Sequence, residues 1–298
     1  MKIGPQHVTP EEWRALDAGS VAHIRAGTAR FQVSGKGAMA CVQGLVTCDV
    51  HALPAGSRAF GALLTSKGMI VTLLWIEKRA GELLLLETTD GGAAALRDVL
   101  QRSIPPRLAT WEDVTASTVG LGIYGPAGTG TPRAVARGAD GVDLIVAPDV
   151  AERTAAAHTR ASDALMEACR ILAGIPALGA EIDEKTLPQE VRFDELGGVS
   201  YTKGCYVGQE TVARVHFRGH PNRRLVMLLL EQEPEALPLQ LTHDGKGVGR
   251  LTSAAWSHEL DAWVAQAVIR REVEDGARLE VAGGTGATVA IERWPRAA

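Results

Sequence analysis

Three apolar runs of strand length follow one another in the first third of the chain. They cover residues 58–64, 69–77 and 82–88, and Lys67-Gly68 and Ala80-Gly81 separate them. Short apolar runs between glycine-containing turns are typical of β-strands. The pattern therefore predicts a meander. Further strands are predicted at 29–34 and 119–124.

Helical patterns occupy other parts of the chain. Thr9-Pro10-Glu11-Glu12 forms a capping box with proline at the first helical position, and Gly19 ends the predicted helix. The segment 175–198 is rich in proline and glycine, so we expect it at the surface or at a domain interface. Further helices are predicted at 36–45, 93–102 and 151–173, with a short one near Arg133.

The chain changes character beyond Asn222. Five or so β-rich runs follow, with turns at Asp244-Gly245, Glu274-Asp275-Gly276 and Gly283-Gly284. This pattern predicts a small antiparallel barrel, and we place a domain boundary near Pro221.

Composition narrows the classes of function. The chain has 298 residues, 46% of them hydrophobic, and a net charge of -4, which gives no overall reason to expect binding to nucleic acid or membrane. No apolar run reaches the length of a membrane span, and the first residues lack the apolar segment of a secretory signal. Four cysteines without a CxxC pair do not form a disulfide framework, so we expect a reducing cytoplasm.

The segment Lys203–Glu210, KGCYVGQE, concentrates residues that favour a reactive thiol. Gly204 and Gly208 allow positive φ or close backbone approach. A lysine two residues before Cys205 favours the thiolate. A buried structural cysteine is the alternative, but this combination favours a functional one.

Other motifs support different chemistry only weakly. Gly120–Gly125 matches GxGxxG, but Pro126 follows where a Rossmann helix would begin. Asp140 or Asp143 could supply the acidic ribose partner of a dinucleotide site. The stretch Gly125–Thr131 resembles a P-loop without its lysine, so triphosphate binding is not expected.

The residues after the cysteine segment are basic. Cys205, His216 and His220 lack the fourth ligand of a structural zinc site, so we expect no metal. The run Arg214–Arg224 is either a solvated loop or the lining of an anion pocket. Phe217 is its single aromatic residue, so stacking on nucleic-acid bases has little support.

Together these segments resemble the folate-binding YgfZ family, which is related to the glycine cleavage T-protein (aminomethyltransferase). The most specific match is KGCYVGQE, and the resemblance covers nearly the whole chain. Further matching segments are Val42–Val50, Thr65–Met69, Arg170–Gly179, Glu181–Asp183, Leu187–Glu190, Leu196–Thr202, Thr211–Arg214 and Gly247–Ser253.

The resemblance implies an α+β fold, a three-domain ring with mixed α/β N-terminal and middle domains and a C-terminal antiparallel β-barrel. Residues 1–221 would form the folate-binding region from two interleaved subdomains, the middle one at roughly 50–115, and residues 222–298 the barrel. A central channel would receive tetrahydrofolate or a derivative.

The resemblance also implies site residues. Glu190 aligns with the T-protein glutamate that bonds the pterin, and a carboxylate can accept two N–H bonds from its edge. Arg214 would face the glutamate of the folate. Further cofactor contacts are expected from Gln43, Thr47, Gln209 and Glu210.

Three departures separate the chain from an aminomethyltransferase. Val71 and Thr72 stand where T-proteins carry an acidic pair that transfer requires. Leu172 replaces a family glutamate, and Thr65 or Ser66 replaces the aspartate of the Lys-Gly turn. We therefore do not expect aminomethyl transfer.

The main hypothesis is a cytoplasmic folate-binding accessory protein that supports assembly or repair of iron–sulfur clusters in other proteins, with a link to tRNA modification. Cys205 would be the functional thiol and Lys203 would favour its thiolate. Expected partners are folate and iron–sulfur proteins or assembly factors, without direct nucleic-acid or membrane contact. The alternatives are a folate-dependent one-carbon transferase, using Glu190 or Glu210 as acid or base, and a protein-binding scaffold whose channel is filled by side chains such as Trp75 or Phe193.

Overall fold

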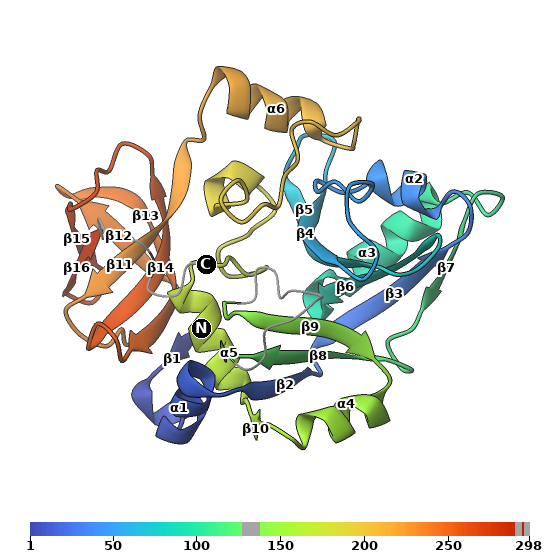
Figure 1. Ribbon diagram of the computed structural model, residues 1–298. Helices are drawn as coiled ribbons and strands as arrows, with labels where there is room; N and C mark the ends of the chain where they lie inside the picture. Colours follow the sequence, from blue (N-terminus) through green and yellow to red (C-terminus); the bar gives the residue numbers. More distant parts are fainter. Residues whose placement is uncertain (127–137, 290–293, 295–298) are drawn as a thin grey trace.

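A computed structural model describes residues 1–126, 138–289 and 294, and three sheets in it surround a common centre (Figure 1). The helix predicted near Arg133 lies outside the described residues, as does most of the P-loop-like stretch. Among the described residues, no helix is long and apolar enough to cross a bilayer.

The C-terminal sheet is a closed antiparallel barrel, which confirms the predicted architecture. Its strands follow the order β13-β12-β15-β16-β11-β14, and β14 pairs back onto β13. A short strand from the other end of the chain, β1 (Lys2–Ile3), adds to β13 in parallel. The barrel strands are β11 (Arg223–Leu230), β12 (Leu239–His243), β13 (Lys246–Ser257), β14 (Ala262–Arg270), β15 (Arg278–Val281) and β16 (Thr285–Val289).

The predicted meander lies in a five-stranded sheet of order β4-β5-β6-β3-β7. Helices α2 (Ala38–Gln43) and α3 (Asp90–Ser103) pack on it, and its apolar core centres on residues such as Phe31 and Leu74. This sheet also takes β3, which precedes the range of roughly 50–115 that we expected. Its strands are β3 (Thr28–Ser34), β4 (Arg58–Leu64), β5 (Ile70–Lys78), β6 (Leu83–Thr89) and β7 (Thr110–Asp113).

The third sheet has the order β10-β2-β8-β9. Strand β10 divides the segment that we predicted as one helix over 151–173, because α4 ends at Ala155 and α5 begins at Asp163. Its strands are β2 (Val21–Arg25), β8 (Val119–Tyr124), β9 (Gly141–Val146) and β10 (Thr159–Arg160), and nearby helices are α1 (Pro10–Ala18), α4 (Pro148–Ala155) and α5 (Asp163–Leu172).

The first helix begins as the sequence predicts. The Thr9 side chain accepts a hydrogen bond from the Glu12 amide, and Glu12 bonds back to the Thr9 amide, which completes the capping box. Three short elements complete the fold, namely η1 (Pro5–His7), η3 (Pro188–Val191) and α6 (Gln209–Arg218).

A buried cluster of four charges joins the five-stranded and four-stranded sheets. Arg25 Nε lies 2.9 Å from Glu87 Oε1, and Arg58 Nη2 lies 2.7 Å from Glu87 Oε2. Asp143 bridges the same two arginines, with Arg58 Nη1 at 2.7 Å. Each cation therefore contacts two carboxylates, and this compensates the cost of taking the charges out of water.

Candidate functional site

The cysteine loop, residues 203–208, packs against the β4–β5 turn at one end and against residues 43–48 at the other. Gly208 has φ +83° and is the N-cap of α6. A Cβ at Gly208 would lie 2.5 Å from the Thr65 carbonyl oxygen, and one at Gly68 would lie 2.9 Å from the Thr211 side chain. Glycine is therefore required at both positions for the loop and the β4–β5 turn to approach so closely.

Lys203 anchors the cysteine loop from below. Its side chain is buried, and Nζ donates to the carbonyl oxygens of Gln43, Val46 and Cys48 at 2.7, 2.6 and 2.8 Å. Burial lowers the pKa of Lys203 to about 8. An ammonium has three N–H donors, and all three are used here. Lys203 thus has no N–H left to donate to the Cys205 sulfur, and its expected support of the Cys205 thiolate stays a prediction.

Cys205 itself is exposed, whereas the next residue is buried. The Tyr206 ring lies 5.0 Å from the Lys203 ammonium, and burial raises the pKa of its hydroxyl to about 12. The amide of Val207 donates to the Gly44 carbonyl at 3.2 Å. The loop is therefore fixed on both sides of a thiol that faces solvent.

Gln43 and Thr47 shape the segment that Lys203 contacts. The Gln43 amide bonds Asp49 Oδ1 at 2.9 Å and the Val50 amide at 2.8 Å, which closes the turn. The buried Thr47 hydroxyl donates to the Gly198 carbonyl at 2.5 Å. Both side chains thus hold the backbone that forms the lysine site.

Glu190 is engaged with the barrel. Arg223 donates to both of its oxygens, from Nε at 3.0 Å and from Nη2 at 2.9 Å, and the Leu187 amide donates at 3.0 Å. This bidentate pair joins η3 to β11. These three bonds leave about one acceptor site of the carboxylate unused, on Oε1, so the pterin contact of Glu190 stays a prediction.

Gln209, Glu210 and Arg214 belong to α6. The first part of the basic run, which we considered as a loop or as the lining of an anion pocket, is therefore helical. Arg214 is exposed on the outer face of the helix, where it lines a hollow with Glu210. The inner face packs through the buried Val212. The structure has a cavity elsewhere, described next, which we call the central cavity. None of the eight site residues that the sequence predicted is among the described residues that line it.

That cavity opens where the four-stranded and five-stranded sheets meet α5, and its volume is about 340 Å³. Leu73, Trp75 and Met166 supply apolar walls, and Thr28, Thr89 and Tyr124 supply polar groups. Apolar walls with a few polar groups are typical of sites for small ligands. Of these residues, sequence reasoning named Trp75 alone, as a side chain that could fill the channel. It missed the others because they come from strands and a helix far apart along the chain.

Charged pairs line one side of the cavity. His23 Nε2 lies 2.8 Å from Asp163 Oδ1. Arg170 binds Glu167 through two hydrogen bonds of 2.8 Å. These pairs place carboxylate and imidazole groups at the cavity wall. Arg170 was part of a matched segment, but the segment alone gave no sign of its partner.

Glu181 connects this wall to the barrel. Its buried carboxylate accepts bonds from Thr252 and Ser253 at 2.6 Å each and from Arg170 at 3.1 Å. Arg170 and these hydroxyl groups hold the pKa of Glu181 below its ordinary value, against the effect of burial. Three of the matched segments, at 170–179, 181–183 and 247–253, therefore meet at one carboxylate.

The position of the missing acidic pair is packed rather than reactive. Thr72 is fully buried, and its hydroxyl lies 2.8 Å from that of Thr88. A Cβ at Gly92, in the first turn of α3, would lie 1.9 Å from Thr72 Oγ1. Glycine at position 92 therefore leaves the space that the Thr72 hydroxyl occupies.

The weaker motifs have structural explanations. Gly120 and Gly122 lie within β8, where added Cβ atoms would lie 2.5 Å from Glu87 and 2.2 Å from the Tyr124 ring. The glycines therefore make space for the charge cluster and for Tyr124. His216 stacks on Tyr201 with ring centroids 3.6 Å apart. Within the described ranges, no group of three or more His, Cys, Asp or Glu residues could hold a metal.

Comparison with known proteins adds two matched domains. The GCVT N-terminal domain matches residues 11–141, and the glycine cleavage T-protein C-terminal barrel domain matches residues 223–296. Two proteins named tRNA-modifying protein YgfZ are similar to the chain. The one from Serratia proteamaculans is 27% identical over 85% of this chain and 86% of its own, and the one from Vibrio atlanticus is 26% identical over 70% and 72%.

A solved structure has the same fold. The glycine cleavage system aminomethyltransferase T from Bartonella henselae superposes with a TM-score of 0.82 and 18% sequence identity, over 96% of this chain and 89% of that one. The predicted ring of two mixed α/β regions and a barrel is therefore confirmed.

Proposed function

The chain is a homologue of the YgfZ tRNA-modifying proteins that carries both domains of the glycine cleavage T-protein, and from this premise we propose a tetrahydrofolate-binding accessory protein for iron–sulfur enzymes. The observation that carries the proposal is the exposed Cys205 thiol in a loop whose backbone is fixed on both sides. A thiol that faces solvent can meet a partner protein, whereas a buried one cannot.

The central cavity supports the folate part of the proposal. A flat pterin ring fits a site with apolar walls such as Leu73 and Trp75, and Glu167 is a carboxylate that could accept N–H bonds from its edge. Tetrahydrofolate, when bound, supplies a carrier for one-carbon units. The chain's own residues would bind and orient the ring and shield it from water.

The cysteine loop supports the iron–sulfur part. One cysteine does not hold a cluster alone, since four cysteine ligands are usual. Cys205 would therefore act transiently on a cluster or on a thiol of a client enzyme. The relatives' name indicates tRNA modification, and we infer that this chain serves it through an iron–sulfur client rather than by contact with RNA.

Anaerobic calorimetry with tetrahydrofolate tests the cofactor. We expect binding, and we expect Ala177→Trp to abolish it because the larger side chain fills the cavity that Ala177 lines. Glu190→Gln serves as the comparison, since Glu190 lies outside the cavity lining. Loss of binding in Glu190→Gln alone would restore the pterin contact that the sequence implied.

Complementation tests the thiol. In a strain lacking this protein, wild type should restore the activity of iron–sulfur enzymes and Cys205→Ser should not. Cys41→Ser is the matched control, because Cys41 is a second free cysteine on α2. Full restoration by Cys205→Ser would exclude the role proposed for the thiol.

The transferase alternative has less support, because Thr72 is packed against Thr88 where T-proteins carry an acid. Ammonia release from an aminomethylated lipoyl carrier protein with tetrahydrofolate would favour it. The scaffold alternative requires a filled channel. Trp75 lines the cavity without closing it, and Phe193 packs 4.9 Å from Phe60 instead.

A further inference from the structure

We propose that the outer face of α6 and the barrel turn beside it form a docking surface for an acidic segment of a partner protein. We call it the α6 basic surface, made of Arg214, Phe217, Arg218, His220 and Arg271. This inference adds to the proposed function. It rests on one part of that function, namely that Cys205 acts on a partner protein. Helix α6 begins four residues after Cys205, so the same continuous segment of the chain carries the thiol and most of this surface.

The α6 residues of this surface share one side of the helix. Arg214, Phe217 and Arg218 recur at helical spacing, are all exposed, and line one hollow of about 470 Å³. The opposite side packs against η3 through Val212, and Gln189 bonds the Val212 carbonyl at 2.9 Å. One face of the helix is therefore packed against the protein, and the opposite face is exposed to solvent.

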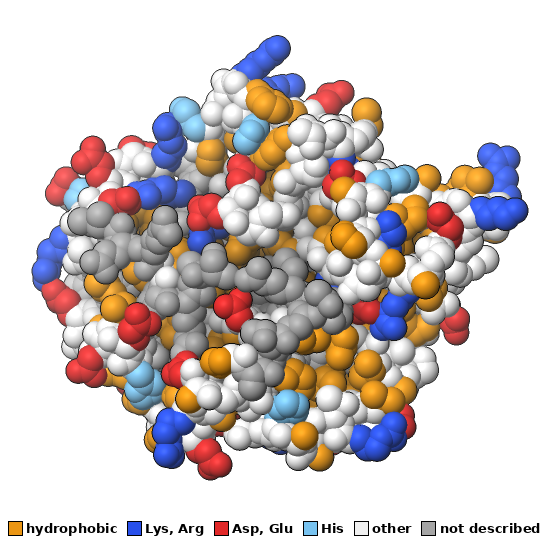
Figure 2. All heavy atoms as spheres, viewed as in Figure 1, with side chains coloured by type: hydrophobic (Ala, Val, Ile, Leu, Met, Phe, Trp, Pro, Cys, Tyr) orange, Lys and Arg blue, Asp and Glu red, His pale blue; other side chains and the backbone are white. Residues whose placement is uncertain are grey.

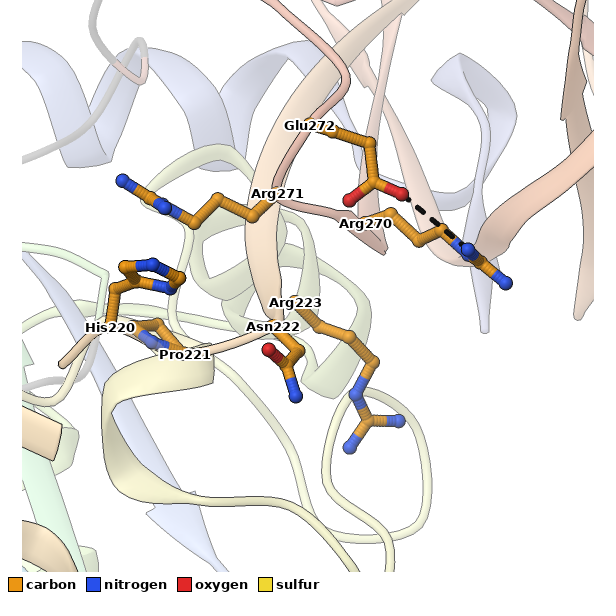
Figure 3. A pocket seen from close by; sticks show the side chains of 7 residues that line it. All are labelled: His220, Pro221, Asn222, Arg223, Arg270, Arg271 and Glu272. Atoms are coloured by element: carbon orange, nitrogen blue, oxygen red, sulfur yellow. Dashed lines mark hydrogen bonds and ion pairs between the residues drawn. The ribbon is translucent and has the colours of Figure 1, made fainter.

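The basic surface extends from α6 onto the barrel. A second hollow of about 590 Å³ lies between the end of α6 and the barrel, lined by His220 and Arg271 among others. Figure 3 shows these two side chains on the same side of the hollow, while Arg270 turns to Glu272 at 3.4 Å. In Figure 2, basic side chains gather over α6 and toward the barrel.

The arginines and the histidine of this surface lack carboxylate partners, unlike many arginines elsewhere. Arg102 pairs with Asp98 and Arg153 pairs with Asp149 on other exposed helices. Within the described residues, no carboxylate pairs with Arg214, Arg218, His220 or Arg271, although the chain as a whole has a charge of -4. Glu210 lines the first hollow and Glu272 the second, so the surface has an excess of basic groups without being free of acidic ones. Such an excess on an acidic protein fits an acidic partner and steers its approach.

Phe217 favours a protein over a nucleic acid as the partner. Phe217 is 66% exposed, and its ring packs edge-on against His216 with the ring centroids 4.7 Å apart. An exposed aromatic residue beside arginines is typical of the centre of protein interfaces. Binding single-stranded RNA would call for several aromatics in succession.

The test uses two fluorescein-labelled nonapeptides, one of glutamate only and one with a central leucine. Anisotropy with the full-length chain should show binding of both, tighter for the leucine peptide and weakened by salt. Arg214→Glu with Arg218→Glu should weaken both peptides by about tenfold or more. Phe217→Ala should remove the preference for leucine and leave the all-glutamate affinity nearly unchanged.

Arg102→Glu, an exposed charge reversal on α3, is the matched control and should bind both peptides like wild type. Absence of peptide binding, or equal weakening by Arg102→Glu and the double variant, would overturn the proposal. Tighter binding of an RNA nonamer that the same double variant abolishes would also overturn it, in favour of a nucleic-acid surface.

Tetrahydrofolate titration of the same variants separates this inference from the proposed function. Folate binding by wild type and by the double variant, without the peptide pattern, would reject the docking surface alone. The peptide pattern without folate binding by wild type would reject the folate proposal and leave the docking surface standing.

Discussion

The cysteine loop and the wall of the central cavity are held in place by different means. The loop depends on backbone carbonyls, three of which surround the Lys203 ammonium. At the cavity wall, Arg25 is held by carboxylates such as Glu87, which also pairs with Arg58. A carbonyl cage fixes the main chain and leaves the neighbouring Cys205 side chain free, whereas ion pairs fix side chains. The carbonyl cage is suited to presenting a thiol at the surface, and the ion pairs are suited to shaping a buried binding site.

Of the substitutions that test this comparison, one in the buried charge cluster should reduce the stability of the protein most. Arg58→Met leaves Glu87 and Asp143 each short of one buried partner, so the free energy of unfolding should fall by about 3–5 kcal/mol. Urea unfolding followed by tryptophan fluorescence measures it. Arg153→Met, which breaks an exposed pair with Asp149, should change it by about 0.5 kcal/mol or less. Similar losses in both variants would mean that the cluster contributes little.

Glu181→Gln tests the link from the cavity wall to the barrel and should cost about 3 kcal/mol at neutral pH. The pKa of Glu181 is lowered in the folded protein, so its stabilisation is present above the ordinary value of 4.5 and is lost as pH falls through the folded value. The stability gap between wild type and variant should therefore narrow below pH 4.5. A constant gap across acid pH would show that charge is not the cause.

Lys203→Met should cost about 2 kcal/mol, because it leaves three carbonyl oxygens without their shared donor. The effect should be partly local, with faster hydrogen exchange at the Val207 amide and altered reactivity of Cys205. Mass spectrometry of exchanged peptides and thiol labelling would detect these changes. Lys67→Met, at an exposed site in the β4–β5 turn, should change neither.

Cys205→Ser should have the smallest effect on the fold, about 0.5 kcal/mol or less, because the side chain is exposed. Tetrahydrofolate affinity should also stay the same, since Cys205 does not line the cavity. Thermal unfolding and calorimetry measure the two quantities. A large loss of either would mean that loop and cavity are not the separate regions described above.

Local signals were enough to predict much of the fold. The strands at 58–64 and 119–124 agree with β4 and β8 to the residue, and the capping box placed α1. Helix α6 was missed because its arginines and histidine obscured a short apolar face in which Val212 alone is buried. Strands β2 and β9 were missed as well, although β2 carries His23 and Arg25 of the cavity.

The candidate site divides in the same way. Cys205 was predicted from its immediate neighbours, and its exposure agrees with a thiol that can react. The partner of Glu190 is 33 residues away, and that of Arg25 is 62 residues away. Such pairs depend on strand order and packing, which the spacing of residue types does not encode.

The Lys203 cage has a consequence for how the protein acquires its thiol site. The ammonium meets carbonyls that lie 155 to 160 positions earlier in the chain. Contacts of such long range cost loop-closure entropy, which the rest of the fold must repay. An unfolded or misfolded molecule therefore exposes the Cys205 thiol without the fixed loop around it, and only the complete fold holds the thiol at a defined place on the surface.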